Sequence, residues 1–155
     1  MTLTTHTAIG AAIGSSVGNP IIGFLLGFAS HFLVDMIPHG DSKMSDSFRL
    51  LHKKGPVAYA SIDGAIALYL VLTLSNIIPS AQLFAFSLAV AGSVLPDLLI
   101  GLQDLTHWRI LKPFFRFHFF FHDFFTKKYG DVKLTYALAG QAAVIIFILL
   151  PLVNG

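Results

Sequence analysis

One short segment of the chain concentrates side chains that bind metal ions. Its sequence, His31-Phe-Leu-Val-Asp35-Met-Ile-Pro-His39-Gly-Asp41, offers up to four ligands within eleven residues. His31 and Asp35 are four residues apart, so a helix presents both on one face, and His39 follows a proline that favours a helix end. Imidazole and carboxylate without sulfur suit Zn²⁺, Mn²⁺, Fe²⁺ or Ni²⁺. The segment predicts a metal site near a helix end.

Other ionisable residues lie inside apolar segments, where a charge at the bilayer centre costs about 2.5–3.5 kcal/mol. A turn at Gly18-Asn19-Pro20 separates His6 from Asp35. Each leg of this hairpin is about 20 Å long, so the two residues return to the same depth. The same arithmetic across the turn at 76–79 brings Asp63 to Asp97.

We therefore predict one pocket that several helices share. Its predicted metal ligands are His6, His31, Asp35, His39 and Asp97, and Asp63 is a predicted catalytic residue. The ion is divalent, with zinc as first choice and manganese or iron as alternatives. A buried polar cluster that only ties helices together, or an intramembrane proton path, is the competing interpretation.

A second segment, Arg116-Phe-His118-Phe-Phe-Phe-His122-Asp123, also spaces two imidazoles four residues apart. Its many phenylalanines and nearby basic residues predict an amphipathic helix in the cytoplasmic interface. We predict that His118 and His122 act in catalysis over the site; the alternative is a membrane anchor with both at headgroup level. Arg109, Lys112 and Arg116 are predicted to hold an anionic headgroup, because guanidinium and phosphate match in geometry.

The composition indicates the elements that position these residues. Of the 155 residues 55% are hydrophobic and only 12% are charged, against about 25% charged in soluble domains. There is no cysteine, and the net charge of +2 does not indicate nucleic-acid binding. We predict an all-α integral membrane bundle forming one domain over 1–155. Its helices are expected at about 4–18, 20–38, 57–78, 80–102 and 133–153, of which all but the short first one span the bilayer.

The basic residues predict the orientation. Every Lys and Arg lies at 39–56, which includes Lys43, Arg49, Lys53 and Lys54, or at 103–133. The positive-inside rule places both regions in the cytoplasm of a bacterial-type inner membrane, with the C-terminus outside. The hairpins 4–38 and 57–102 are a possible duplication. The ladder of Gly10, Gly14 and Gly18, continued by Gly23 and Gly27, predicts close helix packing.

These motifs resemble a known family. Thr5-His6 before a glycine-rich helix, His31-x-x-x-Asp35-x-x-Pro38-His39, Leu95-Pro96-Asp97 and a late histidine pair are similar to small bacterial membrane-bound metal-dependent hydrolases. The similarity spans about 5–123 and implies a His/Asp metal centre with hydrolase activity. A more distant similarity is to zinc-dependent phospholipase C. This chain lacks the Arg and Ser of the family's late motif, His-Arg-x-x-Thr-His-Ser.

The expected function is thus hydrolysis of a membrane lipid or phosphate ester at the cytoplasmic leaflet, with water activated by the metal. Three alternatives remain from the sequence. A transporter of metal ions or protons uses the same intramembrane acids, a b-type haem protein needs two axial histidines, and a scaffold needs the cluster only for structure. The oligomeric state is not predicted.

Overall fold

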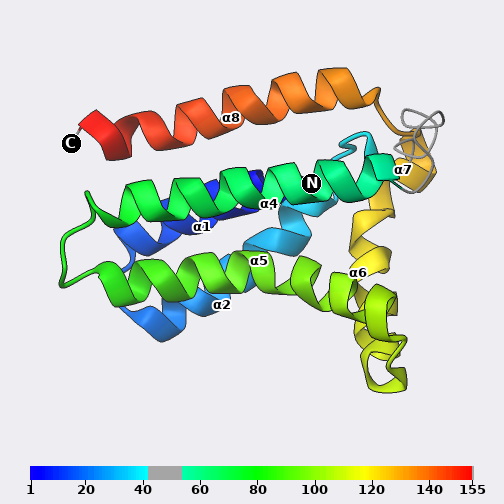
Figure 1. The fold of residues 1–155 in the computed structure, drawn as a ribbon, viewed down its shortest axis with the longest axis horizontal. Helices are drawn as coiled ribbons and strands as arrows, with labels where there is room; N and C mark the ends of the chain where they lie inside the picture. The colour runs from blue at the N-terminus through cyan, green and yellow to red at the C-terminus, as the bar shows by residue number, and fades with distance from the viewer. Residues whose placement is uncertain (42–53, 155) are drawn as a thin grey trace.

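The computed structural model describes residues 1–41 and 54–154, and every regular element in these ranges is helical (Figure 1). The α-helices are α1 (Leu3–Ser16), α2 (Pro20–Asp35), α4 (Lys54–Ser75), α5 (Leu83–Thr106), α6 (Lys112–His122), α7 (Phe124–Tyr129) and α8 (Leu134–Asn154), and a 3-10 turn, η3, covers Arg109–Leu111. The predicted all-α class is therefore confirmed for the described residues. Lys43, Arg49 and Lys53 of the predicted basic loop lie outside them.

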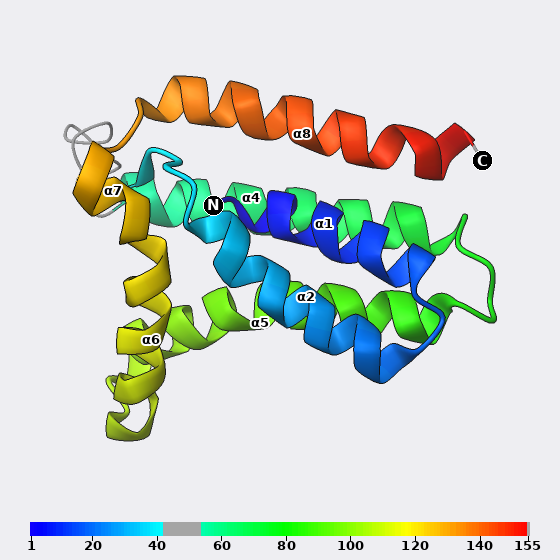
Figure 2. The same ribbon diagram turned by 180° about the vertical axis from the view of Figure 1, so that it is seen from behind.

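Helix α1 is the centre of the bundle. It packs against α2, α4, α5 and α8, and α2 in turn packs along α5. Figures 1 and 2 show these five helices running lengthwise, with α6 crossing them at one end and the C-terminus at the other. The first helix, predicted as a short element at 4–18, thus packs against four of the long helices.

Within the described ranges three helices are long and apolar enough to cross a membrane: α4, α5 and α8. Helix α2 was predicted over 20–38 as a fourth span, but it has only 16 residues and ends at Asp35. Its start follows the sequence closely, because Asn19 accepts hydrogen bonds from the Ile21 and Ile22 main-chain nitrogens and Pro20 occupies the first turn. The helix ends before Pro38, because a proline disfavours helical backbone angles at the residue that precedes it.

Small residues bring α1, α2 and α5 into close contact. A side chain at Gly10 or Gly14 would collide with α5, at Ser93 and at Phe86 respectively, and one at Gly27 would overlap the Ala89 carbonyl oxygen. Gly92 of α5 approaches the Phe24 backbone in the same way. The predicted packing role is confirmed for this set but is wrong for Gly18, because no atom of residues 1–41 or 54–154 lies near enough to exclude a side chain there.

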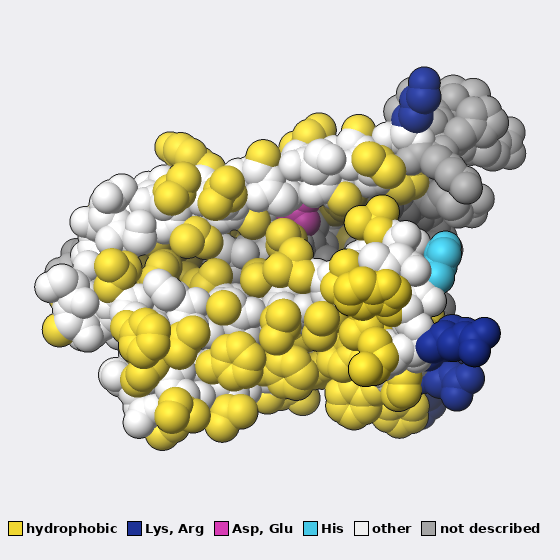
Figure 3. Space-filling view, turned by 60° about the horizontal axis from the view of Figure 1, so that its bottom comes forward, with side chains coloured by type: hydrophobic (Ala, Val, Ile, Leu, Met, Phe, Trp, Pro, Cys, Tyr) yellow, Lys and Arg dark blue, Asp and Glu magenta, His cyan; other side chains and the backbone are white. Residues whose placement is uncertain are grey.

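The outer surface is strongly apolar. Figure 3 shows hydrophobic side chains covering most of one face, while the Lys and Arg side chains on it gather at one end. That end carries η3, α6 and α7, whose basic residues Arg109, Lys112, Arg116, Lys127 and Lys128 are all exposed. The fold therefore has an apolar helical bundle with a basic end. The basic end contains the second basic region, which the sequence places at 103–133.

Candidate metal centre

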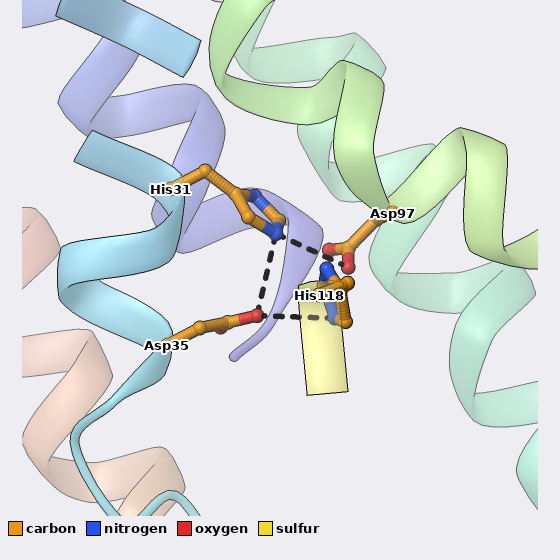
Figure 4. A group of neighbouring side chains, drawn as sticks. All are labelled: His31, Asp35, Asp97 and His118. Carbon is orange, nitrogen blue, oxygen red and sulfur yellow. Dashed lines mark ion pairs between the residues drawn. The ribbon is translucent and has the colours of Figure 1, made fainter. Parts of the chain in front are cut away.

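Three helices bring four ligand side chains together near the basic end. His31 and Asp35 come from α2, Asp97 from α5 and His118 from α6, and one ligand atom of each lies within 4.8 Å of the others. Figure 4 shows the four side chains pointing toward one another from these helices. We call these four residues the primary group. His118 arrives there because α6 crosses the ends of α2 and α5.

The hydrogen bonding of His31 fixes the role of each ring nitrogen. Its Nδ1 lies 2.8 Å from the Ser93 carbonyl oxygen, which can only accept, so Nδ1 carries the proton. In the neutral ring Nε2 then presents a lone pair, 3.3 Å from Asp35 Oδ2 and 3.7 Å from Asp97 Oδ1. Both Nε2 of His31 and Oδ2 of Asp35 are buried, and among the described residues neither has a hydrogen-bond partner. Two acceptors that face each other in a buried site fit a bound cation.

His6 joins the group from α1, as the hairpin arithmetic predicted. Its Nε2 lies 3.0 Å from Asp35 Oδ1 and 3.9 Å from Asp97 Oδ2. Its ring stacks on that of His31 with 4.0 Å between centroids. His6 therefore borders both carboxylates, either as a further ligand or as the residue that orients Asp35.

His118 contributes a neutral imidazole. Its Nε2 lies 3.7 Å from Asp35 Oδ2, and its Nδ1 is buried without a hydrogen-bond partner in the described structure. Burial lowers the pKa of His118 to about 4, so the ring is unprotonated at neutral pH. A neutral ring is the form that binds a metal ion.

Three further ligand side chains form what we call the secondary group: His39, Asp41 and His122. Asp41 Oδ2 lies 3.0 Å from His39 Nε2 and 2.7 Å from His122 Nε2. Burial opposes protonation of His122, but hydrogen bonds with Asp41 and Asp123 outweigh it and raise the pKa of His122 to about 9. The structure thus divides the predicted ligands between two neighbouring groups.

Asp63 lies beside the primary group but outside it. Its carboxylate accepts hydrogen bonds from the Leu3 nitrogen (2.6 Å), the Thr4 nitrogen (3.1 Å) and the Thr4 hydroxyl (2.6 Å). These bonds cap the N-terminus of α1, where the helix dipole favours a negative charge. Asp63 and Asp97 also line one cavity of about 340 Å³, in agreement with their predicted proximity.

The predicted headgroup residues Arg109, Lys112 and Arg116 lie on η3 and α6, exposed at the same end of the molecule as both groups. Sequence reasoning missed two residues that build the site. Gln141 accepts hydrogen bonds from Thr2 and Thr5, which ties α8 to the start of α1. Asp131 accepts a hydrogen bond from the Gly40 nitrogen. The lone glutamine in an apolar helix was the available signal for Gln141.

The described residues thus form a buried His/Asp centre that can hold a divalent cation, next to a second cluster of the same chemistry. Searches of known protein families, curated proteins and solved structures find no match to this chain.

Proposed function

We propose that the chain is an integral membrane protein with its basic end in the cytoplasm. Three helices of spanning length and an apolar surface support this assignment. All seven Lys and Arg residues in the described ranges lie at the end with α6 and α7 or at the adjoining starts of α4 and α8. The positive-inside rule then orients the bundle, and it puts both ligand groups near the cytoplasmic leaflet of an inner membrane.

At this site we propose a metal-dependent hydrolase, which agrees with the resemblance described above. The observation that carries the proposal is the buried pair of unpartnered acceptors, His31 Nε2 and Asp35 Oδ2, inside the primary group. In a cluster that only ties helices together, buried polar atoms are as a rule hydrogen-bonded, so this pair of atoms favours a bound cation.

His31, Asp35 and His118 would hold the ion, and Asp97 would complete its surroundings on the open side. A divalent ion in such a site would polarise a scissile bond and lower the pKa of a bound water molecule to about 7. Asp97 is the most exposed member of the primary group, with 29% of its side chain accessible, and it lines the cavity shared with Asp63. We assign Asp97 to accept the proton of an attacking water that enters from this cavity. Asp63 positions α1, and through it His6.

The proposed substrate is a lipid or other ester with an apolar chain and an anionic head. A cavity of about 400 Å³ lies between α2 and α8, and its walls are mainly apolar side chains such as Ile9, Val34 and Val144. It reaches His39 of the secondary group. An acyl chain in this cavity would place its head near both groups, with Arg109, Lys112 and Arg116 exposed at the same end to bind phosphate.

Metal analysis and an activity screen test the proposal together. The purified protein in detergent should contain stoichiometric divalent metal, and the double variant His31→Ala/Asp35→Ala should lose the ion of the primary group. Phospholipid vesicles and a soluble phosphoester then serve as substrates, with Asp104→Asn, an exposed carboxylate on α5, as the matched control. Wild-type protein without metal refutes the centre. Bound metal without hydrolysis of any ester leaves a metal-stabilised scaffold and refutes the enzyme.

A further inference from the structure

We propose that the secondary group is a second divalent-cation site, so that His39, Asp41 and His122 bind one ion beside the ion of the primary group. This inference deepens the proposed function, since it makes the catalytic centre a two-metal centre.

Both histidines of the secondary group have their Nδ1 atoms held by oxygens that only accept. His39 Nδ1 lies 2.6 Å from the Ile37 carbonyl oxygen, and His122 Nδ1 lies 3.0 Å from Asp123 Oδ1. Each Nδ1 therefore carries a proton and donates it, which leaves Nε2 of each ring as the atom that can bind a metal ion. Histidines that bind a metal ion through one ring nitrogen typically donate the N–H of the other nitrogen to a carboxylate or a backbone carbonyl, as both of these rings do.

The two Nε2 atoms and one carboxylate oxygen converge. The Nε2 atoms of His39 and His122 are 3.2 Å apart, and both lie within 3.0 Å of Asp41 Oδ2. These three ligand atoms face one small region, where a divalent cation would be bound by all of them. Without a metal ion, a proton on His122 Nε2 serves the contact with Asp41, and the Met1 nitrogen, 2.8 Å away, serves His39 Nε2. A single cation could instead bind all three ligand atoms.

The secondary group is also held in place without any ligand. Gly40, between His39 and Asp41, has a φ of +84°, and its nitrogen donates a hydrogen bond to Asp131 Oδ1 at 2.8 Å. A side chain at Gly40 would collide with the Leu134 backbone at the start of α8. The segment after α2 is thus fixed against α8, which orients its two ligands before an ion binds.

The two groups are close enough to act on one substrate. The Met1 nitrogen lies 2.5 Å from Asp35 Oδ1 and 2.8 Å from His39 Nε2, so these two atoms are at most 5.3 Å apart. Helix α6 supplies His118 to one group and His122 to the other, with 5.7 Å between ring centroids. Ions in two-metal hydrolytic centres are about 3.5–4 Å apart, and they stabilise the attacking and leaving oxygens together.

Zinc stoichiometry tests the inference. The full chain in detergent is freed of metal with a chelator, titrated with Zn²⁺ alone, and analysed for bound zinc after gel filtration. We expect two equivalents for the wild type and one for His122→Ala. Asp41→Asn, which keeps the side-chain shape, should bind its second equivalent at least about 100-fold more weakly, because even outer-shell partners are worth 10- to 100-fold.

Two further variants separate this inference from the proposed function. His31→Ala should also bind one equivalent, and His107→Asn, which replaces an exposed histidine at a left-handed position (φ 54°), should bind two. The one equivalent retained by His122→Ala verifies that the variant is folded. Wild type with one equivalent, retained in His122→Ala and lost in His31→Ala, overturns the second site and leaves the primary centre intact. Two equivalents in His122→Ala, or none despite native circular dichroism, also overturn it; no zinc in the wild type overturns both proposals.

Discussion

Replacing Asp35 by asparagine distinguishes a metal centre from a structural ion-pair cluster. Asp35 is 1% exposed, and its Oδ2 faces the lone pair of His31 Nε2 at 3.3 Å. In the metal-free protein, Asp35→Asn can turn its amide group toward His31 and keep its oxygen toward His6. It thereby converts a contact between two acceptors into a hydrogen bond, worth about 0.5–1.5 kcal/mol. Asp35 Oδ1 also forms an ion pair with the Met1 nitrogen at 2.5 Å, which the neutral amide weakens. The two effects oppose each other, so we expect the metal-free variant to be about as stable as the wild type.

Zinc, in contrast, should stabilise the two proteins unequally. At a free concentration 100 times the dissociation constant, a bound ion stabilises the wild type by about 2.7 kcal/mol. Loss of a charged ligand should weaken zinc binding at least about 100-fold, since outer-shell partners alone account for 10- to 100-fold. At the same zinc concentration the primary centre of the variant would then gain only about 0.4 kcal/mol.

Thermal unfolding in detergent, followed by far-ultraviolet circular dichroism with chelator and with zinc, measures both effects. Asp104→Asn is the control, because it removes an exposed carboxylate from α5 and should leave both values unchanged. If the metal-free Asp35→Asn protein instead loses about 3–5 kcal/mol, the value for breaking a buried salt bridge, the primary group is a structural ion pair. Full zinc stabilisation of the variant would equally refute the reasoning.

Three other predictions follow from particular contacts. Gly27→Ala should destabilise the fold by about 1–3 kcal/mol, because the methyl group overlaps the Ala89 carbonyl oxygen, whereas Gly64→Ala on the open side of α4 should be neutral or stabilising; melting temperatures of the pair check this. Asp63→Asn should cost about 0.5–2 kcal/mol through the weakened cap of α1, and an unchanged melting temperature would contradict that role. Zinc binding to the secondary group should release about one proton at pH 7.5, because the pKa of His122 is raised to about 9 and the ring must lose its proton to bind; its affinity should therefore rise with pH up to about 9. His118, with a pKa of about 4, should release no proton when zinc binds to the primary group. Calorimetry in buffers of different ionisation enthalpy measures the number of protons released at each group.

The sequence predicted the parts of the site that depend on helix periodicity. The spacing of His31 and Asp35 and the equal legs of the first hairpin follow from 1.5 Å rise per residue, and the structure brings His6, His31, Asp35 and Asp97 together. The membership of His118 was left open, because its place depends on the angle at which α6 crosses α2 and α5.

The division into two groups could not be predicted, since His39 and Asp41 lie beyond the end of α2. Their positions depend on the positive φ of Gly40 and on its hydrogen bond with Asp131, which is distant in sequence. Helix periodicity also could not predict that Asp63 caps the N-terminus of α1. A carboxylate in an apolar helix can face a cation or the N-terminus of a neighbouring helix, and only tertiary packing places α1 against α4.

The central position of α1 has a consequence for biogenesis. This helix is synthesised before its partners, yet Thr5, His6 and Thr7 are almost completely buried, and Gly10 and Gly14 lie directly against α5. Those polar side chains cannot be sheltered by α5, nor can His6 meet Asp97, until translation has passed residue 97. For the membrane protein that we propose, a nascent chain arrested in α4 should therefore keep α1 bound at the translocon instead of releasing it into lipid.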